Sequence, residues 1–285
     1  MTNFASGQGR VNRCAVIGHP IAHSLSPLLH RTAYAQLGLL DFRYDAFDVD
    51  EHELDDFIAD LEAQNRDGAR WVGLSVTAPN KPGLLSHGVV DPLAQALHAG
   101  NTLIFGSPNR VYNTDVTGLV SALGARGVER VETAQLIGNG ATARSSLAAF
   151  HRLGVGSVQV NARSRERAER SLGELAGFYG IELTFVDFDS PSPEPVDLLV
   201  NSVPVNLDAE AAALLVAPAK NVFELTYNFY PSNLEQAGQA AGKNTLSGMD
   251  LLVFQALDQI ELMTGQRTDP RPLLDAGYKA LESKK

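Results

Sequence analysis

The chain has 285 residues, of which 44% are hydrophobic and 20% are charged, and its formal net charge is −10. This length and composition predict a soluble globular protein with one large domain or two medium ones. Because the charge is acidic and no basic patch stands out, the sequence argues against binding to nucleic acid or to an anionic membrane surface.

The single cysteine, Cys14, excludes an internal disulfide framework and favours a reducing compartment, so we predict a cytoplasmic protein. The first residues show no apolar segment of the kind found in secretory signals. No apolar run approaches the roughly 18 residues that a membrane-spanning helix needs. The seven histidines are scattered without metal-binding spacing, so no metal is expected.

Apolar runs with the character of strands alternate along the chain with segments typical of helices. The strand-like segments lie at 13–18, 42–49, 71–76, 134–138, 158–162, 183–188, 197–201 and 221–225. The helix-like segments lie at 27–38, 51–64, 141–154, 165–180 and 249–265. This alternation predicts an α/β protein with largely parallel sheets. The helix at 249–265 is apolar on nearly every face, which predicts that it is buried.

The first strand leads into the sequence HSLSP at 23–27, which stands at the mouth of the first helix. Pro27 suits the first helical position, Ser26 suits the N-cap, and Gly38 suits the residue after the helix end. Capping accounts for Ser26, but a second hydroxyl at Ser24 is not needed for it.

The strand at 71–76 ends in the sequence TAPNK, which runs from Thr77 to Lys81. A lone lysine is most often solvated. Lys81, however, follows a turn stiffened by proline at the end of a parallel-type strand, where α/β sheets place their ligand crevice. This position makes Lys81 a candidate site residue.

The sequence NTLIFGSPNRVYNTD at 101–115 is typical of two short strands joined by the turn GSPN. Such a hairpin places Asn101 near Asn113 and Asp115. Asp115 has a second interpretation as the cap of a helix that begins near Gly118. Further along, Gln255 lies in the apolar helix, where its amide needs a partner, and the residues alone favour a partner in the core over a ligand.

The strand, turn and helix at 134–150 carry the pattern G-x-G-x-x-G/A at Gly138, Gly140 and Ala143. The first glycine permits the tight turn, the second permits close approach of a pyrophosphate, and the third position needs a small residue for packing. The free N–H groups of the helix N-terminus then face the phosphates. We therefore predict a dinucleotide site, whose phosphate loop also includes Asn139, Ala141 and Thr142.

The next strand decides between the two nicotinamide cofactors. Units that bind NAD place an acidic residue at its end, but this chain has Asn161 and Ala162 followed by Arg163. An arginine can bind a 2′-phosphate through two hydrogen bonds. We therefore predict NADP, with Arg163 as the leading contact and Arg165 as a second one; the alternative is that both are solvated.

These motifs together resemble those of the shikimate dehydrogenase family, and the likeness runs almost from end to end. Six motifs occur in the family's order. They are HSxSPxxH at 23–30, NVTxPxK at 75–81, NT at 101–102, NTD at 113–115, the late tyrosine Tyr227, and GxxxLxxQ at 248–255. Any one of them is modest evidence, whereas six in the same order are highly specific.

The resemblance implies a two-domain α/β protein with a cleft between its domains. Residues 1–117 and 249–285 form the substrate-binding domain, and residues 118–248 form a Rossmann-like NADP-binding domain. The implied reaction is the reversible reduction of 3-dehydroshikimate to shikimate by NADPH, in the biosynthesis of chorismate and aromatic amino acids. The partner is thus a small molecule, and the protein is a monomer or a homodimer.

The resemblance also implies roles for individual residues. Ser24 and Ser26 hold the substrate carboxylate, and Lys81 with Asp115 forms the catalytic pair. The ring hydroxyls are bound by Thr77, Asn101, Asp115 and Gln255, with Tyr227 alongside. The cofactor site adds Ala162, Leu225 and Gly248 to the phosphate loop and the two arginines.

The chain departs from the family pattern at several positions, and rival functions remain. Ser75 replaces the usual Asn, Ala141 replaces a Gly, and Ala162 replaces an Asn. One rival is a quinate or quinate/shikimate dehydrogenase that uses NAD; Ser26 and Arg163 favour shikimate and NADP instead. The other is a non-catalytic NADP-binding sensor, against which the joint presence of the four polar residues Lys81, Asn101, Asp115 and Gln255 argues.

Overall fold

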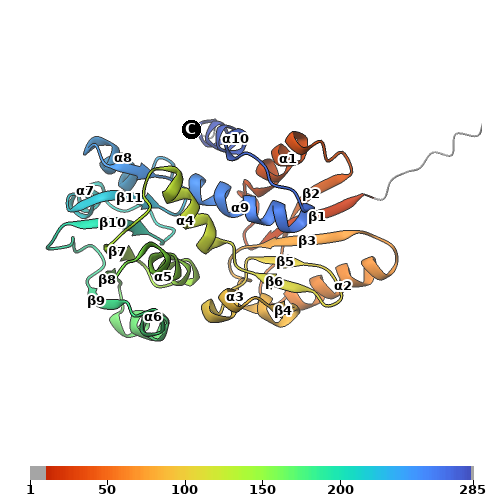
Figure 1. The fold of residues 1–285 in the computed structure, drawn as a ribbon, viewed down its shortest axis with the longest axis horizontal. Helices are drawn as coiled ribbons and strands as arrows, with labels where there is room; N and C mark the ends of the chain where they lie inside the picture. The colour runs from red at the N-terminus through yellow and green to blue at the C-terminus, as the bar shows by residue number, and fades with distance from the viewer. Residues whose placement is uncertain (1–10, 284–285) are drawn as a thin grey trace, which may run out of the picture. The chain divides into compact units, whose positions relative to one another are not determined.

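The structure is a computed structural model, and it describes residues 11–283. The chain forms two compact units (Figure 1). The first unit contains the described residues up to Gln95 together with Ala99–Asn113 and Gln259–Asp269. The second unit contains Ala96–His98, Thr114–Asp258 and the described residues from Pro270 onward. The long helix α9 (Gly248–Thr264) therefore supplies residues to both units.

The first unit is built on a six-stranded sheet in the order β2-β1-β3-β5-β6-β4. Its strands are β1 (Asn12–Gly18), β2 (Phe42–Asp48), β3 (Trp71–Val76), β4 (Val89–Val90), β5 (Thr102–Ile104) and β6 (Arg110–Tyr112). Its helices are α1 (Ser26–Leu37), α2 (Leu54–Arg66) and the 3-10 helix η1 (Gly83–His87), and α3 (Pro92–Leu97) begins in it. β1 pairs in parallel with β2 and β3, whereas β5 is antiparallel to both β3 and β6.

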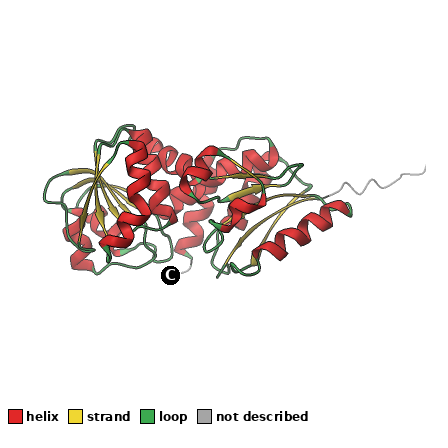
Figure 2. Cartoon of the chain, turned by 90° about the horizontal axis from the view of Figure 1, so that it is seen from below, coloured by secondary structure: helices red, strands yellow, loops and turns green. Residues whose placement is uncertain are grey.

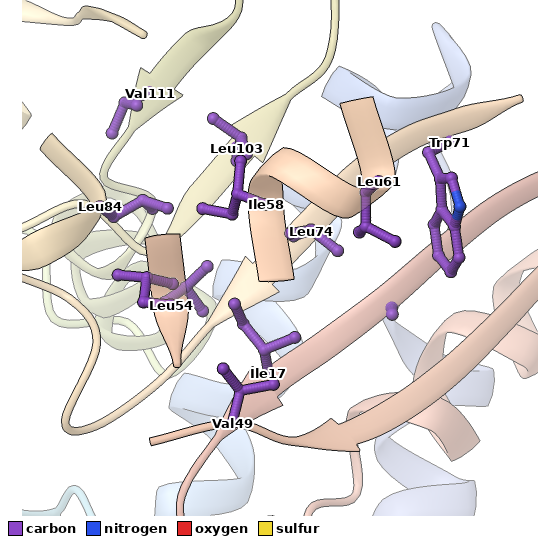
Figure 3. Close-up of a cluster of buried hydrophobic side chains, with 12 residues drawn as sticks. Ile17, Val49, Leu54, Ile58, Leu61, Trp71, Leu74, Leu84, Leu103 and Val111 are labelled. Atoms are coloured by element: carbon purple, nitrogen blue, oxygen red, sulfur yellow. The ribbon is translucent and has the colours of Figure 1, made fainter. Parts of the chain in front are cut away.

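The two faces of this sheet have separate cores, because successive side chains of a strand point to opposite faces. On one face Ile17 of β1 and Leu74 of β3 pack with Ile58 and Leu61 of α2, as Figure 3 shows. On the other face a second cluster joins residues of β1 and β2 to α1 and the end of α9, and consists of Cys14, Val16, Ile21, Tyr34, Tyr44 and Met263. The sheet is thus covered on both sides, which suits its parallel part.

The second unit contains a six-stranded sheet in which every pairing is parallel, in the order β12-β11-β10-β7-β8-β9. Its strands are β7 (Thr133–Ile137), β8 (Ser157–Asn161), β9 (Glu182–Val186), β10 (Val196–Asn201), β11 (Ala219–Glu224) and β12 (Asn244–Leu246). Its helices are α4 (Asp115–Ala125), α5 (Ala141–Leu153), α6 (Arg165–Tyr179), α7 (Ala209–Val216), α8 (Asn233–Ala240), α10 (Pro270–Glu282) and most of α9. Helices lie on both sides of this sheet (Figure 2). Numbered from β7, the strand order is that of the doubly wound dinucleotide-binding fold.

Most of the predicted elements are confirmed. The α/β alternation yields parallel pairing, and the segment 101–115 contains the antiparallel pair β5 and β6. The predicted burial of the last apolar helix is also confirmed, since no residue from 248 to 264 is exposed. Among residues 11–283 no helix combines the length and the apolar character needed to cross a bilayer.

Two predicted helix starts were wrong. Ser26 is the first residue of α1 rather than its N-cap, and Leu25 precedes it without any side-chain cap. The reason is local, because the Leu29 N–H bonds the Leu25 carbonyl at 3.1 Å and makes Leu25 the residue that precedes the helix. The helix expected near Gly118 begins at Asp115, because the Gly118 N–H bonds the Thr114 carbonyl at 3.0 Å and closes an earlier first turn.

Candidate functional site

The carboxyl ends of β1 and β3 meet at one edge of the first sheet and bring several predicted site residues together. The Thr77 N–H donates to the Ile17 carbonyl at 2.9 Å, and the Val76 N–H donates to the Asn101 carbonyl at 2.8 Å. The Lys81 carbonyl accepts the Gly100 N–H at 2.9 Å. Backbone hydrogen bonds therefore hold the segments of Thr77, Lys81 and Asn101 side by side. This is the edge at which open α/β sheets bind ligands.

The turn that carries Lys81 is held from inside by its neighbour Asn80, which is 1% exposed. The Asn80 Nδ2 donates to the Val49 carbonyl at 2.8 Å. The Asn80 N–H donates to the Thr77 carbonyl at 3.0 Å, and the Asn80 carbonyl accepts the Leu84 N–H at 3.0 Å. These hydrogen bonds fix the backbone of the turn, so the position from which the half-buried Lys81 side chain extends is defined.

Ser24 lies in the loop that follows β1, and Ser26 begins α1 directly after that loop. The end of β1 is beside the Thr77 segment. The His19 N–H donates to the Ala78 carbonyl at 3.0 Å, which joins this loop to the turn after β3. Ser26 is 5% exposed, and Ser24 is partly exposed and accepts the Ser26 N–H through its hydroxyl oxygen. A hydroxyl that accepts one bond retains its proton for donation. Ser24 therefore has both a structural contact and a donor for an anion.

Asp115 and Gln255 lie in the second unit, where α4 and α9 are in close contact. Asp115 begins α4 and is 7% exposed, and Gln255 is also 7% exposed. The Thr114 hydroxyl donates to the Gln255 Oε1 at 3.3 Å, and the Gln255 Nε2 donates to the Leu252 carbonyl at 2.9 Å. The expected core partners of the Gln255 amide are therefore present.

The loop after β11 carries Leu225 and Tyr227, and it is anchored by Glu224, which is 1% exposed. Both the N–H and the hydroxyl of Thr226 donate to the Glu224 Oε1, at 3.0 and 2.9 Å. The Asn201 amide donates to the Glu224 Oε2 at 2.8 Å. Burial raises the pKa of Glu224 to about 7, against the lowering effect of these hydrogen bonds.

Sequence reasoning missed Glu224 and Asn201. Each is a polar residue that ends a buried strand of the second sheet, and that position was the available signal.

The phosphate loop has the geometry that its glycines predict. Gly138 has φ +108°, and a Cβ there would lie 2.5 Å from the Ser202 hydroxyl oxygen. Gly140 precedes α5, and a Cβ there would meet no atom within 4 Å. No side chain caps the N-terminus of α5, while Ala143 is fully buried as the third position requires. The space at Gly140 and the uncapped helix end fit a pyrophosphate.

The neighbouring ends of β7 and β10 mark the switch point of the sheet. β7 and β10 are neighbours, and their connections leave in opposite directions, which is where doubly wound sheets bind dinucleotides. The Ser202 N–H donates to the Ile137 carbonyl at 3.0 Å and its hydroxyl at 2.7 Å. The remaining members of the predicted loop, Asn139, Ala141 and Thr142, lie in this turn or in the first turn of α5.

The end of β8 fits NADP better than NAD. Asn161 is fully buried and donates to the Ser190 carbonyl at 2.7 Å, so its amide faces the protein. Arg163 is exposed, and its guanidinium lies 4.9 Å from the centre of the Phe188 ring. Arg165 instead forms an ion pair with Glu169 at 2.8 Å. The residues 161–163 include no carboxylate, and Arg163 stays the predicted contact for a 2′-phosphate.

Gly248 begins α9 and lies against the loop after β11. A Cβ at Gly248 would come 2.6 Å from the Thr226 carbonyl oxygen and 2.9 Å from that of Leu225. Only glycine permits this approach, so Gly248 and Leu225 are brought together as the predicted cofactor set requires. Within residues 11–283 no group of three or more His, Cys, Asp or Glu side chains could hold a metal ion.

Comparison with known proteins supplies the family context. The sequence of residues 16–103 matches the family described as the shikimate dehydrogenase substrate binding domain. The shikimate dehydrogenase (NADP(+)) of Anaeromyxobacter sp. (strain K) is 34% identical over 284 residues, which cover 97% of this chain and 98% of that protein. The corresponding protein of Natronomonas pharaonis is 32% identical and covers 92% and 96% of the two chains.

Solved structures agree with the sequence relatives. The crystal structure of Mycobacterium tuberculosis shikimate dehydrogenase has a TM-score of 0.82 at 30% identity, covering 94% of this chain and 99% of that one. The Thermus thermophilus shikimate 5-dehydrogenase, solved in complex with NADP(H) and shikimate, has a TM-score of 0.80 at 29% identity. It covers 95% of this chain and all of its own.

Proposed function

The chain belongs to the shikimate dehydrogenase family, and from this premise we propose that it catalyses the reversible, NADP-dependent reduction of 3-dehydroshikimate to shikimate. The observation that carries the proposal is the sheet edge of the first unit. There, on a chain that matches its relatives over almost their whole length, backbone hydrogen bonds gather Thr77, Lys81 and Asn101. In this proposal the second unit binds NADP, and the substrate contacts include residues of the first unit.

The chain supplies binding groups for a small hydroxylated acid. The Ser24 and Ser26 hydroxyls hold the carboxylate, which needs donors because the chain as a whole is acidic. Thr77 and Asn101 bind ring hydroxyls, and Asp115, Tyr227 and Gln255 complete the substrate contacts. Because both hydroxyls are neutral, they orient the carboxylate through hydrogen bonds alone.

The catalytic roles fall to Lys81 and Asp115. When bound, NADPH supplies the hydride to the ketone carbon. As charge develops on the ketone oxygen, the Lys81 ammonium stabilises it and donates a proton to it. Asp115, the second member of the proposed catalytic pair, accepts a hydrogen bond from the substrate hydroxyl. In the reverse direction Lys81 takes up the same proton.

The cofactor contacts come from the second unit. The turn from Gly138 to Thr142 and the N-terminus of α5 hold the pyrophosphate, because their N–H groups and the space at Gly140 suit an anion. Arg163 holds the 2′-phosphate, with Arg165 and Ala162 beside it along the chain. Leu225 and Gly248 close the nicotinamide side. We place the reaction in the cytoplasm, where a chain whose one cysteine is buried needs no oxidising environment.

A Lys81→Ala variant tests the catalytic assignment. We expect its turnover with shikimate and NADP to fall by a factor on the order of 100 or more, while substrate binding stays nearly intact. Steady-state rates and a binding titration measure the two effects separately. Near-normal turnover would end the assignment of Lys81.

The wild-type protein supplies the test of substrate and cofactor. Shikimate with NADP should be turned over faster than quinate with NAD, as followed by absorbance of the reduced nicotinamide. Faster turnover of quinate with NAD would make it a quinate dehydrogenase. No absorbance change with either pair over a wide pH range would favour a sensor.

A further inference from the structure

A continuous run of buried polar groups crosses the first unit and ends at the proposed substrate residue Asn101. At its far end the Tyr44 hydroxyl of β2 donates to the Ser75 Oγ of β3 at 2.6 Å. The Ser75 hydroxyl in turn donates to the Gln259 Oε1 of α9 at 2.7 Å. Tyr44, Ser75 and Gln259 are 1%, 3% and 1% exposed. Bulk water does not reach these groups, so each depends on its neighbour for its hydrogen bonds.

Gln259 is the branch point of this run, because both of its N–H bonds lead to Asn101. The Gln259 Nε2 donates to the Asn101 carbonyl oxygen at 3.1 Å and to the Thr102 Oγ1 at 3.1 Å. The Thr102 hydroxyl then donates to the Asn101 Oδ1 at 2.9 Å. One primary amide thus contacts the backbone of Asn101 directly and its side chain through a single hydroxyl.

The direction of the donors determines how the Asn101 amide is turned. Ser75 donates to the oxygen of the Gln259 amide, so the nitrogen of that amide must face Thr102 and Asn101. Because the Thr102 oxygen accepts from Gln259, its proton is directed to the Asn101 Oδ1. The Asn101 Nδ2 is therefore at the other end of its planar amide group, away from Thr102. Donors aligned in one direction strengthen one another in a buried network.

The surroundings of the network keep it uncharged. The His30 ring is fully buried and stacks on the Tyr44 ring, with 3.9 Å between ring centres and 20° between planes. Burial lowers the pKa of His30 to about 3, against the raising effect of Gln259. Burial likewise raises the pKa of Tyr44 far above its ordinary value. Around neutral pH the run therefore contains only neutral hydrogen-bonding groups.

We propose that Gln259 is a positioning residue for the substrate, which acts by turning the Asn101 amide through Thr102 so that Asn101 meets a ring hydroxyl as an N–H donor. The inference rests on the proposed function, because that function assigns Asn101 to substrate binding. Ser75 takes part as well. Where the family usually has Asn, the short Ser75 hydroxyl links Tyr44 to Gln259 in two hydrogen bonds.

A Gln259→Met variant tests the proposal, since methionine keeps the length of the side chain but removes both N–H donors. We expect the KM for shikimate to rise about tenfold, as for the loss of one well-formed hydrogen bond. The KM for NADP should stay within twofold. Gln135→Met is the matched control in the second unit, because Gln135 is fully buried and donates to Asn161 at 2.9 Å without any link to Asn101. Its KM for shikimate should stay within twofold of wild type.

A double-mutant cycle separates positioning from loss of stability. In an Asn101→Ala background, Gln259→Met should change kcat/KM for shikimate by less than twofold, because the residue through which it acts is gone. A full tenfold effect in that background would mean that Gln259 supports the fold only. Should Gln259→Met fail to fold, as judged by circular dichroism, Thr102→Val removes only the bridging hydroxyl and should raise the same KM. An unchanged KM in Thr102→Val overturns the proposal.

The outcome for the wild-type protein keeps the two proposals apart. Without shikimate-dependent reduction of NADP by the wild type, the proposed function fails. With an active wild type and an unchanged KM in Gln259→Met, only the role of Gln259 fails.

Discussion

Replacing Gly118 by alanine tests the close packing of α4 on α9. These two helices carry Asp115 and Gln255. A Cβ at Gly118 would lie 2.7 Å from both the Gln255 Cβ and its backbone nitrogen, and 2.8 Å from its Cα. Ordinary carbon contacts are about 3.5–4.0 Å. The helices would therefore have to separate by roughly 1 Å to admit the methyl group. Overpacking of this kind costs about 1–3 kcal/mol, and we expect the upper end because backbone atoms cannot rotate away.

Gly124 supplies the matched control in the same helix, since a Cβ there meets no atom within 4 Å. Alanine favours a helix over glycine by about 1 kcal/mol. Gly124→Ala should therefore raise the free energy of unfolding by about 0.5–1 kcal/mol. Gly118→Ala has the same gain in propensity but loses about 3 kcal/mol in packing, so its net loss is about 2 kcal/mol.

Urea unfolding of the two variants and the wild type measures these differences. A loss of about 2 kcal/mol corresponds to a melting temperature lower by roughly 4–8 °C. Because Gln255 is the residue displaced, Gly118→Ala should also raise the KM for shikimate, whereas Gly124→Ala should not. If Gly118→Ala is as stable as Gly124→Ala, the helices are not in the close contact described, and the reasoning fails.

Two further predictions concern the second unit. Arg163→Ala should raise the KM for NADP about tenfold or more and leave that for NAD within twofold, because a charge-assisted hydrogen bond to the 2′-phosphate contributes about 1.5–3 kcal/mol. Arg167→Ala is the control, because Arg167 is an exposed residue of α6, and it should change neither KM. Equal rises in the KM for both cofactors in Arg163→Ala would contradict the 2′-phosphate role. Burial raises the pKa of Glu224 to about 7, so the folded state binds this proton more tightly than an unfolded chain with a pKa of 4.5. The stability that the proton contributes is complete below about pH 4.5 and is lost as the pH rises through 7. Urea unfolding should therefore show Glu224→Gln gaining roughly 3 kcal/mol relative to wild type over that window; a constant difference would exclude the raised pKa.

Local patterns predicted the elements whose signals lie within a few residues of one another. The alternation of apolar runs with helical segments predicted parallel strands, and the turn at 106–109 predicted the pair β5 and β6. Gly138 and Gly140 predicted the tight turn before α5 because each glycine answers a local demand, namely a positive φ and an open face; its binding of a phosphate stays a prediction.

Some elements were missed although the sequence contained their signals. Helix α8 begins with a capping box, in which Ser232 and Glu235 satisfy each other's backbone N–H groups. Helix α7 begins after Asp208, whose carboxylate accepts the N–H of Glu210 at 2.9 Å. Both patterns lie within a few residues of one another, so the starts of these two helices were predictable from the sequence without any tertiary contact. The start of α1 differs from the prediction by one residue, since the Leu29 N–H bonds the Leu25 carbonyl.

By itself the sequence determined the fold class and the family, because periodicity, turn residues and ordered motifs are properties of the chain. Only the tertiary structure decided which polar groups satisfy one another. Ser75 and Gln259 are 184 positions apart, yet they share a hydrogen bond of 2.7 Å. A buried donor takes whichever acceptor the packing of strands and helices brings within about 3 Å, and no local pattern in the sequence encodes that choice.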